Sequence, residues 1–395
     1  SSIEKMGPTT STEEKICNFF KEILNIPSIG IDENFFQLGG HSLLATELLL
    51  QLRKTFAIDL SISVIFNQPT VKELAQVVEQ AKKKSLAVID RQQVERIPLS
   101  HAQRSLWFIQ QLDESSASYN IPLVYTFEQP IDVLKLIKVI GKVVEKHAIL
   151  RTIYPAVDGV PYQQIVDEAP KVLIEEVALD EVQSKIKACT RYAFDLKHEP
   201  GFRVTLINMK TLVVVFHHIS ADGWSLATFT EDLQLAYDLH ELEPLTIQYH
   251  DFAVWQQTHG VYTNDNLSYW MEKLKHSPDE IELVRDGKRQ FQSKPESETL
   301  TFTIDAALHQ RLQQLAKNKQ ATLYMVLQSG FLALMTKLGA GEDLILGSPM
   351  AGRDQEELLA NVGMFINTVA MRTDTSGDPN FVTLLERVKQ TCIEA

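Results

Sequence analysis

The chain has 395 residues, of which 44% are hydrophobic and 23% charged, and its formal net charge is -13. This length predicts two or three domains, because one hydrophobic core rarely serves so long a chain. The acidic balance argues against a duplex nucleic-acid partner, since phosphate recognition requires a basic face. We therefore expect the partners to be small molecules or other proteins.

Cysteine usage and hydropathy predict the compartment. The chain has three widely spaced cysteines, Cys17, Cys189 and Cys392. An odd, scattered set favours reduced thiols over a disulfide framework. No run reaches the roughly 20 apolar residues that a membrane helix needs, and the start of the sequence is too polar for a signal peptide. We therefore expect a cytoplasmic protein that does not enter a membrane.

The N-terminal part of the chain predicts a small helical bundle. Ser11 or Thr12 is a candidate helix cap, with Glu14 as its capping-box partner. Apolar spacing predicts further helices over residues 42–56 and 70–78. The short connections between them predict that the helices pack together. A stretch rich in charge and without a sustained apolar face follows, which predicts a linker.

From Ile97 onward, strand patterns alternate with helical patterns, which predicts an α/β domain. The predicted strands cover residues 123–127, 202–207 and 211–216, and the predicted helices cover residues 133–147 and 226–239. A second succession begins near Leu300 with the strand pattern Leu-Thr-Phe-Thr-Ile, and helices follow over residues 307–318 and 323–338. We therefore expect two lobes of similar build.

One string in the helical part combines a glycine pair with a serine: residues 32–43 read Asp-Glu-Asn-Phe-Phe-Gln-Leu-Gly-Gly-His-Ser-Leu. Gly39 and Gly40 permit a tight loop with positive φ that places Ser42 at the exposed start of the next helix. There the helix dipole and the free backbone N–H groups favour a phosphate on the serine oxygen. Capping statistics alone favour a plain N-cap serine.

This string resembles the attachment motif of peptidyl carrier proteins, which contain Leu-Gly-Gly-His-Ser and bear 4'-phosphopantetheine on the serine. The resemblance implies that Ser42 carries 4'-phosphopantetheine, whose terminal thiol holds an acyl group as a thioester. We expect Phe35, Phe36 and Leu38 to pack the loop onto the bundle and not to touch substrate.

A histidine pair follows the strand pattern of residues 211–216, in the string His-His-Ile-Ser-Ala-Asp-Gly at residues 217–223. A single histidine is most often a satisfied core residue. Neighbours on a strand point to opposite sides, so only one of His217 and His218 can easily face a cleft. No third ligand stands at a spacing that zinc sites use, so we expect no metal.

The same string resembles the His-His-x-x-x-Asp-Gly motif of condensation domains and related chloramphenicol-acetyltransferase-like acyltransferases. The resemblance implies that His218 faces the active-site tunnel. It implies a structural role for His217 and Asp222, with Asp222 holding the loop through an ion pair with an arginine. Arg353 is the candidate arginine, and the alternative for this residue is a surface role. Gly223 is expected to let the loop turn closely and to offer its backbone N–H to the reacting carbonyl.

Further segments resemble the same family, at residues 98–108, 119–122, 146–152, 249–255, 347–353 and 363–368. Ser105 replaces an arginine of the family pattern and Ala148 a glutamate, which we interpret as structural variation. We expect Trp107, Trp255 and Phe365 in the core. A later His-Gln-Asp-x-Pro-Phe-Glu segment of the family has no counterpart, which predicts an incomplete second lobe.

Together the resemblances imply a carrier–condensation unit of a nonribosomal peptide synthetase. They predict an all-α four-helix carrier domain at 1–81, a linker at 82–96, and a two-lobed α/β condensation domain with lobes at 97–272 and 273–395. The implied partners are a phosphopantetheinyl transferase, an adjacent adenylation domain, a downstream carrier domain and aminoacyl or peptidyl thioesters.

The implied reaction is attack by the amine of a downstream aminoacyl thioester on the carbonyl of the upstream acyl group. An α-amine has a pKa near ~8, so an appreciable fraction is neutral near pH 7. His218 would take the proton that the nitrogen releases, or would align the amine. A peptidyl epimerase and a catalytically silent recruitment domain share the fold and remain alternatives. A heterocyclising domain is disfavoured, because those domains replace the histidine pair by an aspartate motif.

Overall fold

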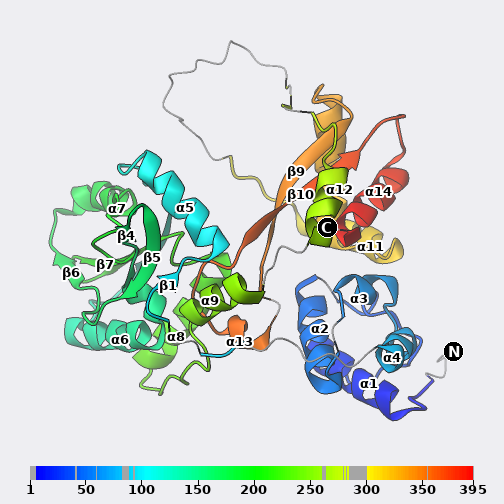
Figure 1. Cartoon of the computed structure of the whole chain (residues 1–395), viewed down its shortest axis with the longest axis horizontal. Coiled ribbons are helices and arrows are strands. Elements are labelled where there is room, and N and C mark those ends of the chain that lie inside the picture. The colour runs from blue at the N-terminus through cyan, green and yellow to red at the C-terminus, as the bar shows by residue number, and fades with distance from the viewer. Residues whose placement is uncertain are drawn as a thin grey trace. The chain divides into compact units, whose positions relative to one another are not determined.

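The computed structural model describes residues 6–40, 42–58, 60–81, 89–91, 94–259, 264–278, 280–281, 283, 300–353 and 355–394. The chain splits into two compact units (Figure 1). The first unit comprises residues 1–86, 264–348 and 368–395, and the second comprises residues 87–263 and 349–367. Among the described helices, none is long and apolar enough to cross a bilayer.

Four helices build the N-terminal part of the first unit, as predicted: α1 (Ser11–Leu24), α2 (Ser42–Phe56), α3 (Ser63–Asn67) and α4 (Val71–Gln80). Their apolar faces form one core, in which Phe20, Leu48 and Leu74 are fully buried. The predicted cap of α1 is wrong by one residue. Thr10 accepts from the backbone N–H of Glu13, whose carboxylate accepts from Thr10 in return, because Thr10 is still extended while Ser11 is already helical.

A second group of elements completes the first unit: α10 (Asn264–Lys273), α11 (Ala306–Asn318), α12 (Leu323–Lys337), β9 (Asp343–Met350), β10 (Asn367–Asp374) and α14 (Phe381–Glu394). Strands β9 and β10 pair with each other. The strand predicted at Leu300 is wrong. Phe302 is 78% exposed, and within the described residues 300–304 pair with no strand, because alternation without a paired neighbour does not stabilise a strand.

The second unit is built on a four-stranded sheet in the order β2-β8-β7-β6. The strands are β2 (Asn120–Thr126), β6 (Val172–Glu175), β7 (Phe202–Ile207) and β8 (Thr211–His217). Strand β8 runs antiparallel to both neighbours, so that Phe216 lies opposite Ile121 on one side and Phe202 on the other. Every residue of β8 is buried, which places the histidine pair at the end of the central strand.

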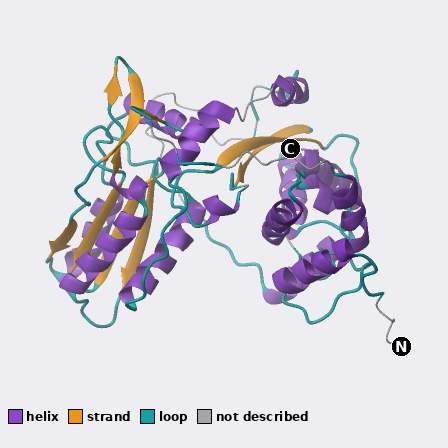
Figure 2. Cartoon of the chain, turned by 60° about the horizontal axis from the view of Figure 1, so that its bottom comes forward, coloured by secondary structure: helices purple, strands orange, loops and turns teal. Residues whose placement is uncertain are grey.

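Helices cover both faces of this sheet (Figure 2). They are α5 (His101–Leu112), α6 (Val133–Lys146), α7 (Val182–Thr190) and α8 (Gly223–Tyr237). Val214 and Phe216 pack with the cores of α6 and α8, whereas Val213 and Val215 pack with side chains of α5 and α7. Alternate side chains of β8 thus belong to two hydrophobic layers, one on each face of the sheet. This is expected for a strand that is buried on both faces.

Short elements complete the second unit: β1 (Ile97–Pro98), η1 (Ala148–Arg151), β3 (Thr152–Ile153), β4 (Ala156–Val157), β5 (Val160–Ile165), η2 (Leu179–Glu181), α9 (Tyr249–His259) and α13 (Glu356–Leu359). Within the predicted linker, Ile89 is buried in the core of this unit. Arg91 donates to the carbonyl oxygens of Leu245 and Thr246. Residues 89–91 are therefore fastened to the second unit.

Candidate functional site

The two histidines of the motif lie in different environments. His217 is fully buried. Its Nδ1 accepts from the Ile219 backbone N–H at 3.0 Å, so its Nε2 carries the proton and donates to Gln110 Oε1 at 3.3 Å. Burial, with His218 as a smaller cause, lowers the pKa of His217 to about 4. His217 is therefore a neutral, structural hydrogen-bonding residue near neutral pH.

His218 is half-buried, unlike its neighbour. Its backbone N–H donates to Tyr119 O at 2.8 Å, which continues the pairing of β2 and β8 by one residue. Its Nδ1 is buried and finds no hydrogen-bond partner among the described residues. A buried ring followed by a half-buried ring agrees with the alternation expected at the end of a strand.

Asp222 and Arg353 form the ion pair that the family resemblance predicts. Arg353 Nη2 lies 3.1 Å from Asp222 Oδ1, and both side chains are almost fully buried. The second carboxylate oxygen of Asp222 accepts from Phe365 N at 3.1 Å. Arg353 also donates to Asn361 O at 2.7 Å and its guanidinium lies 4.0 Å from the Phe365 ring centroid. Such added bonds are what a buried pair needs to offset desolvation.

The same loop starts α8. Asp222 is the N-cap of this helix and accepts from the Ser225 backbone N–H at 2.8 Å. Ser225 Oγ in turn donates to Gly363 O at 2.9 Å. The aspartate of the motif thus performs two tasks, since it caps a helix and also holds the segment that carries Arg353.

His147, whose role sequence reasoning missed, also holds the segment that carries Arg353. His147 Nδ1 accepts from Val362 N at 3.4 Å, and its Nε2 donates to Asp232 Oδ2 at 2.6 Å. Burial lowers the pKa of His147 against the opposing effect of Asp232. Lys146 also contacts Asp232, at 2.8 Å. Asp232 and Val362 lie 85 and 215 positions from His147 in the sequence. No local pattern could therefore have paired them with this histidine.

The expectation that a close turn of the loop requires glycine at position 223 is wrong. Gly223 does not have a positive φ, and a Cβ at this position would meet nothing within 4 Å. As the first residue of α8, it has a first-turn backbone N–H, which no carbonyl of its own helix accepts. Close packing against the histidine loop instead requires glycine at Gly201, where a Cβ would lie 2.6 Å from Ser220 Oγ.

The carrier loop is held by bonds among its own residues and by one bond from Phe35 N to Pro69 O at 2.8 Å. Asn34 Oδ1 accepts from the backbone N–H groups of Phe36 and Gln37 at 2.9 and 3.2 Å. Gly39 has a φ of 113°, and the Gly40 N–H donates to Phe35 O at 3.0 Å. A Cβ on Gly40 would collide with the Phe35 ring, so this position needs glycine. Phe35 and Phe36 are buried, as expected.

This loop fits a phosphate-bearing group. Helix α2 begins at Ser42, and its first turn contains no acidic residue. The first-turn backbone N–H groups of a helix favour an anion at this end. His41 of the motif lies outside the described residues. Within the described residues there is also no group of three or more potential metal ligands.

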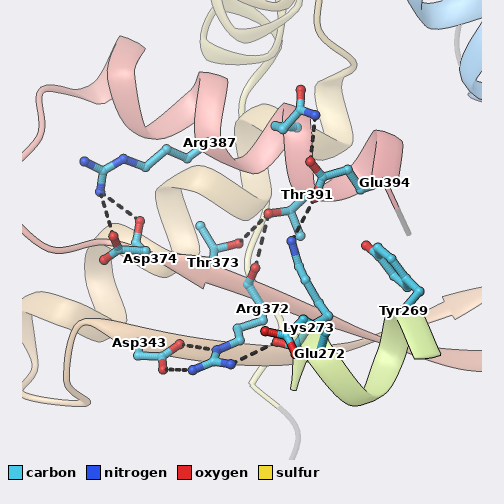
Figure 3. Close-up of a pocket in the computed structure, with 11 residues that line it drawn as sticks. Tyr269, Glu272, Lys273, Asp343, Arg372, Thr373, Asp374, Arg387, Thr391 and Glu394 are labelled. Atoms are coloured by element: carbon cyan, nitrogen blue, oxygen red, sulfur yellow. Dashed lines mark hydrogen bonds and ion pairs between the residues drawn. The ribbon is translucent and has the colours of Figure 1, made fainter. Parts of the chain in front are cut away.

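A cavity of about 950 Å³ lies in the first unit, between α10, the paired strands and α14 (Figure 3). Each cation that lines it has an acidic neighbour: Arg372 with Asp343 at 2.6 Å, Lys273 with Glu394 at 2.8 Å and Arg387 with Asp374 at 3.9 Å. None of the predicted site residues lines this cavity. Its charges are already paired, so we assign it no ligand.

Comparisons with known proteins agree with both motifs. Residues 92–395 match the family model of the condensation domain, and residues 14–78 match that of the phosphopantetheine attachment site. A dimodular nonribosomal peptide synthase of Bacillus subtilis is 40% identical over 415 residues, which cover 100% of this chain and 18% of that protein. A probable non-canonical nonribosomal peptide synthetase of Salinispora arenicola is 40% identical over 411 residues, or 98% of this chain and 5% of that protein.

A solved complex of the X-domain and OxyB from teicoplanin biosynthesis is similar in structure. It has a TM-score of 0.71 and 26% identity, and the likeness covers 79% of this chain and 72% of that chain. The chain therefore belongs to the condensation-domain family. It is a carrier domain followed by a condensation domain of the kind found in nonribosomal peptide synthetases. The predicted family, fold class and covalent 4'-phosphopantetheine are confirmed.

Proposed function

We propose that this unit joins two substrates through an amide bond, with His218 as its central catalytic residue and Ser42 as the attachment point of 4'-phosphopantetheine. The observation that carries the proposal is the contrast between the two histidines, of which one is sealed in the core and the other is half-buried. When attached, the cofactor supplies a thiol that holds the upstream acyl group in an activated form.

In the proposed reaction an amine attacks the acyl carbonyl carbon, the carbon–nitrogen bond forms and the thiol leaves. The nitrogen becomes cationic on attack and must lose one proton. Because Nδ1 of His218 is buried, its Nε2 is the nitrogen that we assign to accept this proton or to align the amine. Such base assistance is typically worth about 10²–10⁴-fold in rate.

Three residues of the same unit support this role. Asp222 and Arg353 hold the loop that carries His218, and neither is proposed to transfer a proton, because both are buried and bonded to each other. Gly223 is proposed to donate its first-turn N–H to the developing oxyanion, and the open space beside it agrees with a reactant at this place. The division into a carrier at 1–81, a linker at 82–96 and lobes at 97–272 and 273–395 belongs to the same proposal.

A recruitment role without catalysis is the second candidate, because the similar X-domain was solved in complex with OxyB. A peptidyl epimerase would use the same histidine to move an α-proton. The retained pair of His218 and Gly223 favours chemistry on a carbonyl over recruitment alone. The segments at 98–108 and 119–122 favour condensation over epimerisation.

The test is a reconstitution. The chain is treated with a phosphopantetheinyl transferase and coenzyme A, loaded with an aminoacyl group and mixed with a panel of aminoacyl thioesters that serve as acceptors. We expect one adduct on Ser42 and an amide product, both identified by mass spectrometry. An adduct without any amide would favour recruitment, and inversion of the α-carbon without an amide would favour an epimerase.

The implied partners enter the same proposal. A phosphopantetheinyl transferase would modify Ser42, an adjacent adenylation domain would supply the aminoacyl group, and a downstream carrier domain would present the acceptor. The two relatives described above are much longer than this chain, which spans 18% and 5% of them.

A further inference from the structure

A buried polar cluster lies directly behind the histidine motif and has no part in the proposed reaction. Gln103 on α5 is fully buried. Its Nε2 donates to Ile219 O at 3.2 Å, the carbonyl of the residue that follows His218. The hydroxyl of Tyr154, also fully buried, lies 3.5 Å from the same carbonyl and 3.4 Å from Ser220 Oγ. Two side chains distant in sequence thus converge on one peptide unit.

The orientation of the Gln103 amide is fixed from its other end. Its Oε1 accepts from the Ser100 backbone N–H at 3.1 Å, so Nε2 must point toward Ile219. Tyr249 uses its hydroxyl proton to donate to Met364 O at 2.6 Å. The 2.7 Å bond between Ser100 Oγ and Tyr249 must therefore be donated by the serine. The Gln103 amide therefore cannot flip without breaking the capping box that it forms with Ser100 at the start of α5.

These bonds restrain the backbone on both sides of His218. Before it, the His218 N–H donates to Tyr119 O at 2.8 Å. After it, the Ile219 N–H donates to His217 and the Ile219 carbonyl accepts from Gln103. The side-chain direction of a residue follows its backbone dihedrals, so a backbone that is held before and after His218 restricts where the imidazole points.

We propose that Gln103 and Tyr154 are positioning residues that aim the His218 imidazole by holding the Ile219 carbonyl. This inference rests on the proposed amide-forming function. An alternative is that the cluster only stabilises the fold, since buried amides and hydroxyls need partners wherever they lie. The two roles differ in what they change. Loss of a positioning residue lowers the turnover number of the folded protein. Loss of a residue that only stabilises the fold lowers the amount of folded protein and leaves its turnover number unchanged.

The test compares three variants in the reconstituted amide assay, at a temperature where each remains folded by circular dichroism. Tyr154→Phe removes one hydroxyl and preserves the ring. Gln103→Met preserves length and removes the amide. Tyr125→Phe is the matched control, because its hydroxyl bonds Thr230 in the same unit at 2.8 Å but does not contact the motif loop.

We expect Gln103→Met to lower kcat on the order of 10²-fold, the loss that a displacement of about 1 Å can cause, while KM for the acceptor changes little. Tyr154→Phe should lower kcat by about tenfold, a smaller loss in keeping with its longer bonds. The double variant should lose less than the product of the two single effects, because both groups hold one carbonyl. Tyr125→Phe should keep the kcat of the parent chain.

Normal kcat in folded Gln103→Met and Tyr154→Phe would overturn the inference, as would an equal loss in Tyr125→Phe. If Gln103→Met does not fold, Tyr154→Phe alone decides, since it removes a single oxygen. The result is separable from the proposed function. An active parent chain that loses activity in His218→Ala, together with unaffected Gln103 and Tyr154 variants, rejects only the positioning role.

Discussion

The two functional loops of the chain are held in opposite ways. The loop before Ser42 is held from within its own small bundle: Asn34 accepts from amides two and three residues ahead, Gly40 donates back to Phe35, and Phe35 N donates to Pro69 O. The loop that carries His218 is held by residues that lie 116 and 131 positions from their partners, namely Gln103 and Arg353.

This difference has a consequence for each site. A loop with local contacts forms as soon as its own small bundle folds, and it can present a group that must travel. A loop with remote contacts acquires its geometry only when the whole second unit has folded. It therefore suits a catalytic group whose direction must be fixed before the reactants arrive.

The largest expected effect is the loss of the imidazole to which we assign the catalytic role. His218→Ala should lower the rate of amide formation by about 10²–10⁴-fold and leave the mass-spectrometric adduct on Ser42 unchanged. His240→Ala, which removes an exposed imidazole after α8, is the control and should behave as the parent chain. Turnover of His218→Ala within a factor of two of the parent would remove His218 from the mechanism.

The remote support of the loop should be costly to break. Arg353→Ala leaves the Asp222 carboxylate buried without its counter-charge, and we expect the free energy of unfolding to fall by about 3–5 kcal/mol. Urea unfolding followed by tryptophan fluorescence measures this change. Lys171→Ala, which removes the exposed pair with Glu168, should leave the transition midpoint in place. Equal midpoints for both variants would contradict a supporting role for Arg353.

Acid should weaken the second unit through His217. Its pKa is lowered to about 4, against ~6.5 for an unfolded histidine, so between these values the unfolded state binds more protons. The contribution of neutral His217 to the free energy of unfolding is fully present above pH ~6.5. The free energy of unfolding then falls by up to about 3 kcal/mol as the pH falls toward 4. Unfolding midpoints measured across this range should show the slope, and His217→Asn should reduce it while the contribution of the buried His147 remains. An identical slope in His217→Asn would assign the acid sensitivity to other groups.

The local support of the carrier loop should be less costly to disturb. Gly40→Ala places a Cβ against Phe35, and such overpacking typically costs about 1–3 kcal/mol. Hydrogen exchange of peptides from α1 and α2 should become faster, and modification of Ser42 slower, while the second unit keeps its exchange rates. Gly7→Ala is the control, since a Cβ there meets nothing within 4 Å. Unchanged exchange in Gly40→Ala would show that the loop adapts.

The smallest effect should come from a helix end. Thr10→Ala removes the side-chain acceptor that caps α1 and should lower carrier stability by about 1 kcal/mol. Ser11→Ala lies one residue further, inside the helix, and should be close to neutral. Thermal unfolding of the two variants by circular dichroism therefore distinguishes the observed cap from the one that the sequence predicts. A larger loss in Ser11→Ala would reverse the assignment.

Sequence alone determined the elements with strong local signals. Strand β7 has the predicted bounds and α2 begins at Ser42 as predicted, because periodic burial and a glycine–glycine loop act over a few residues. The strand predicted at Leu300 failed, because its partner would have to come from elsewhere in the chain. The ion pair of Asp222 with Arg353 was identified through the family resemblance and not through spacing.

Tertiary structure decided the surroundings of the two histidines. That His217 is sealed and His218 half-buried agrees with strand alternation, but the sheet face that became the interior depended on α5 and α7 packing over β8. The contacts of Gln103, Tyr154 and His147 join segments that lie far apart in the sequence. A hydrogen bond between such segments leaves no local pattern, since its geometry exists only once the hydrophobic layers have brought the chains together.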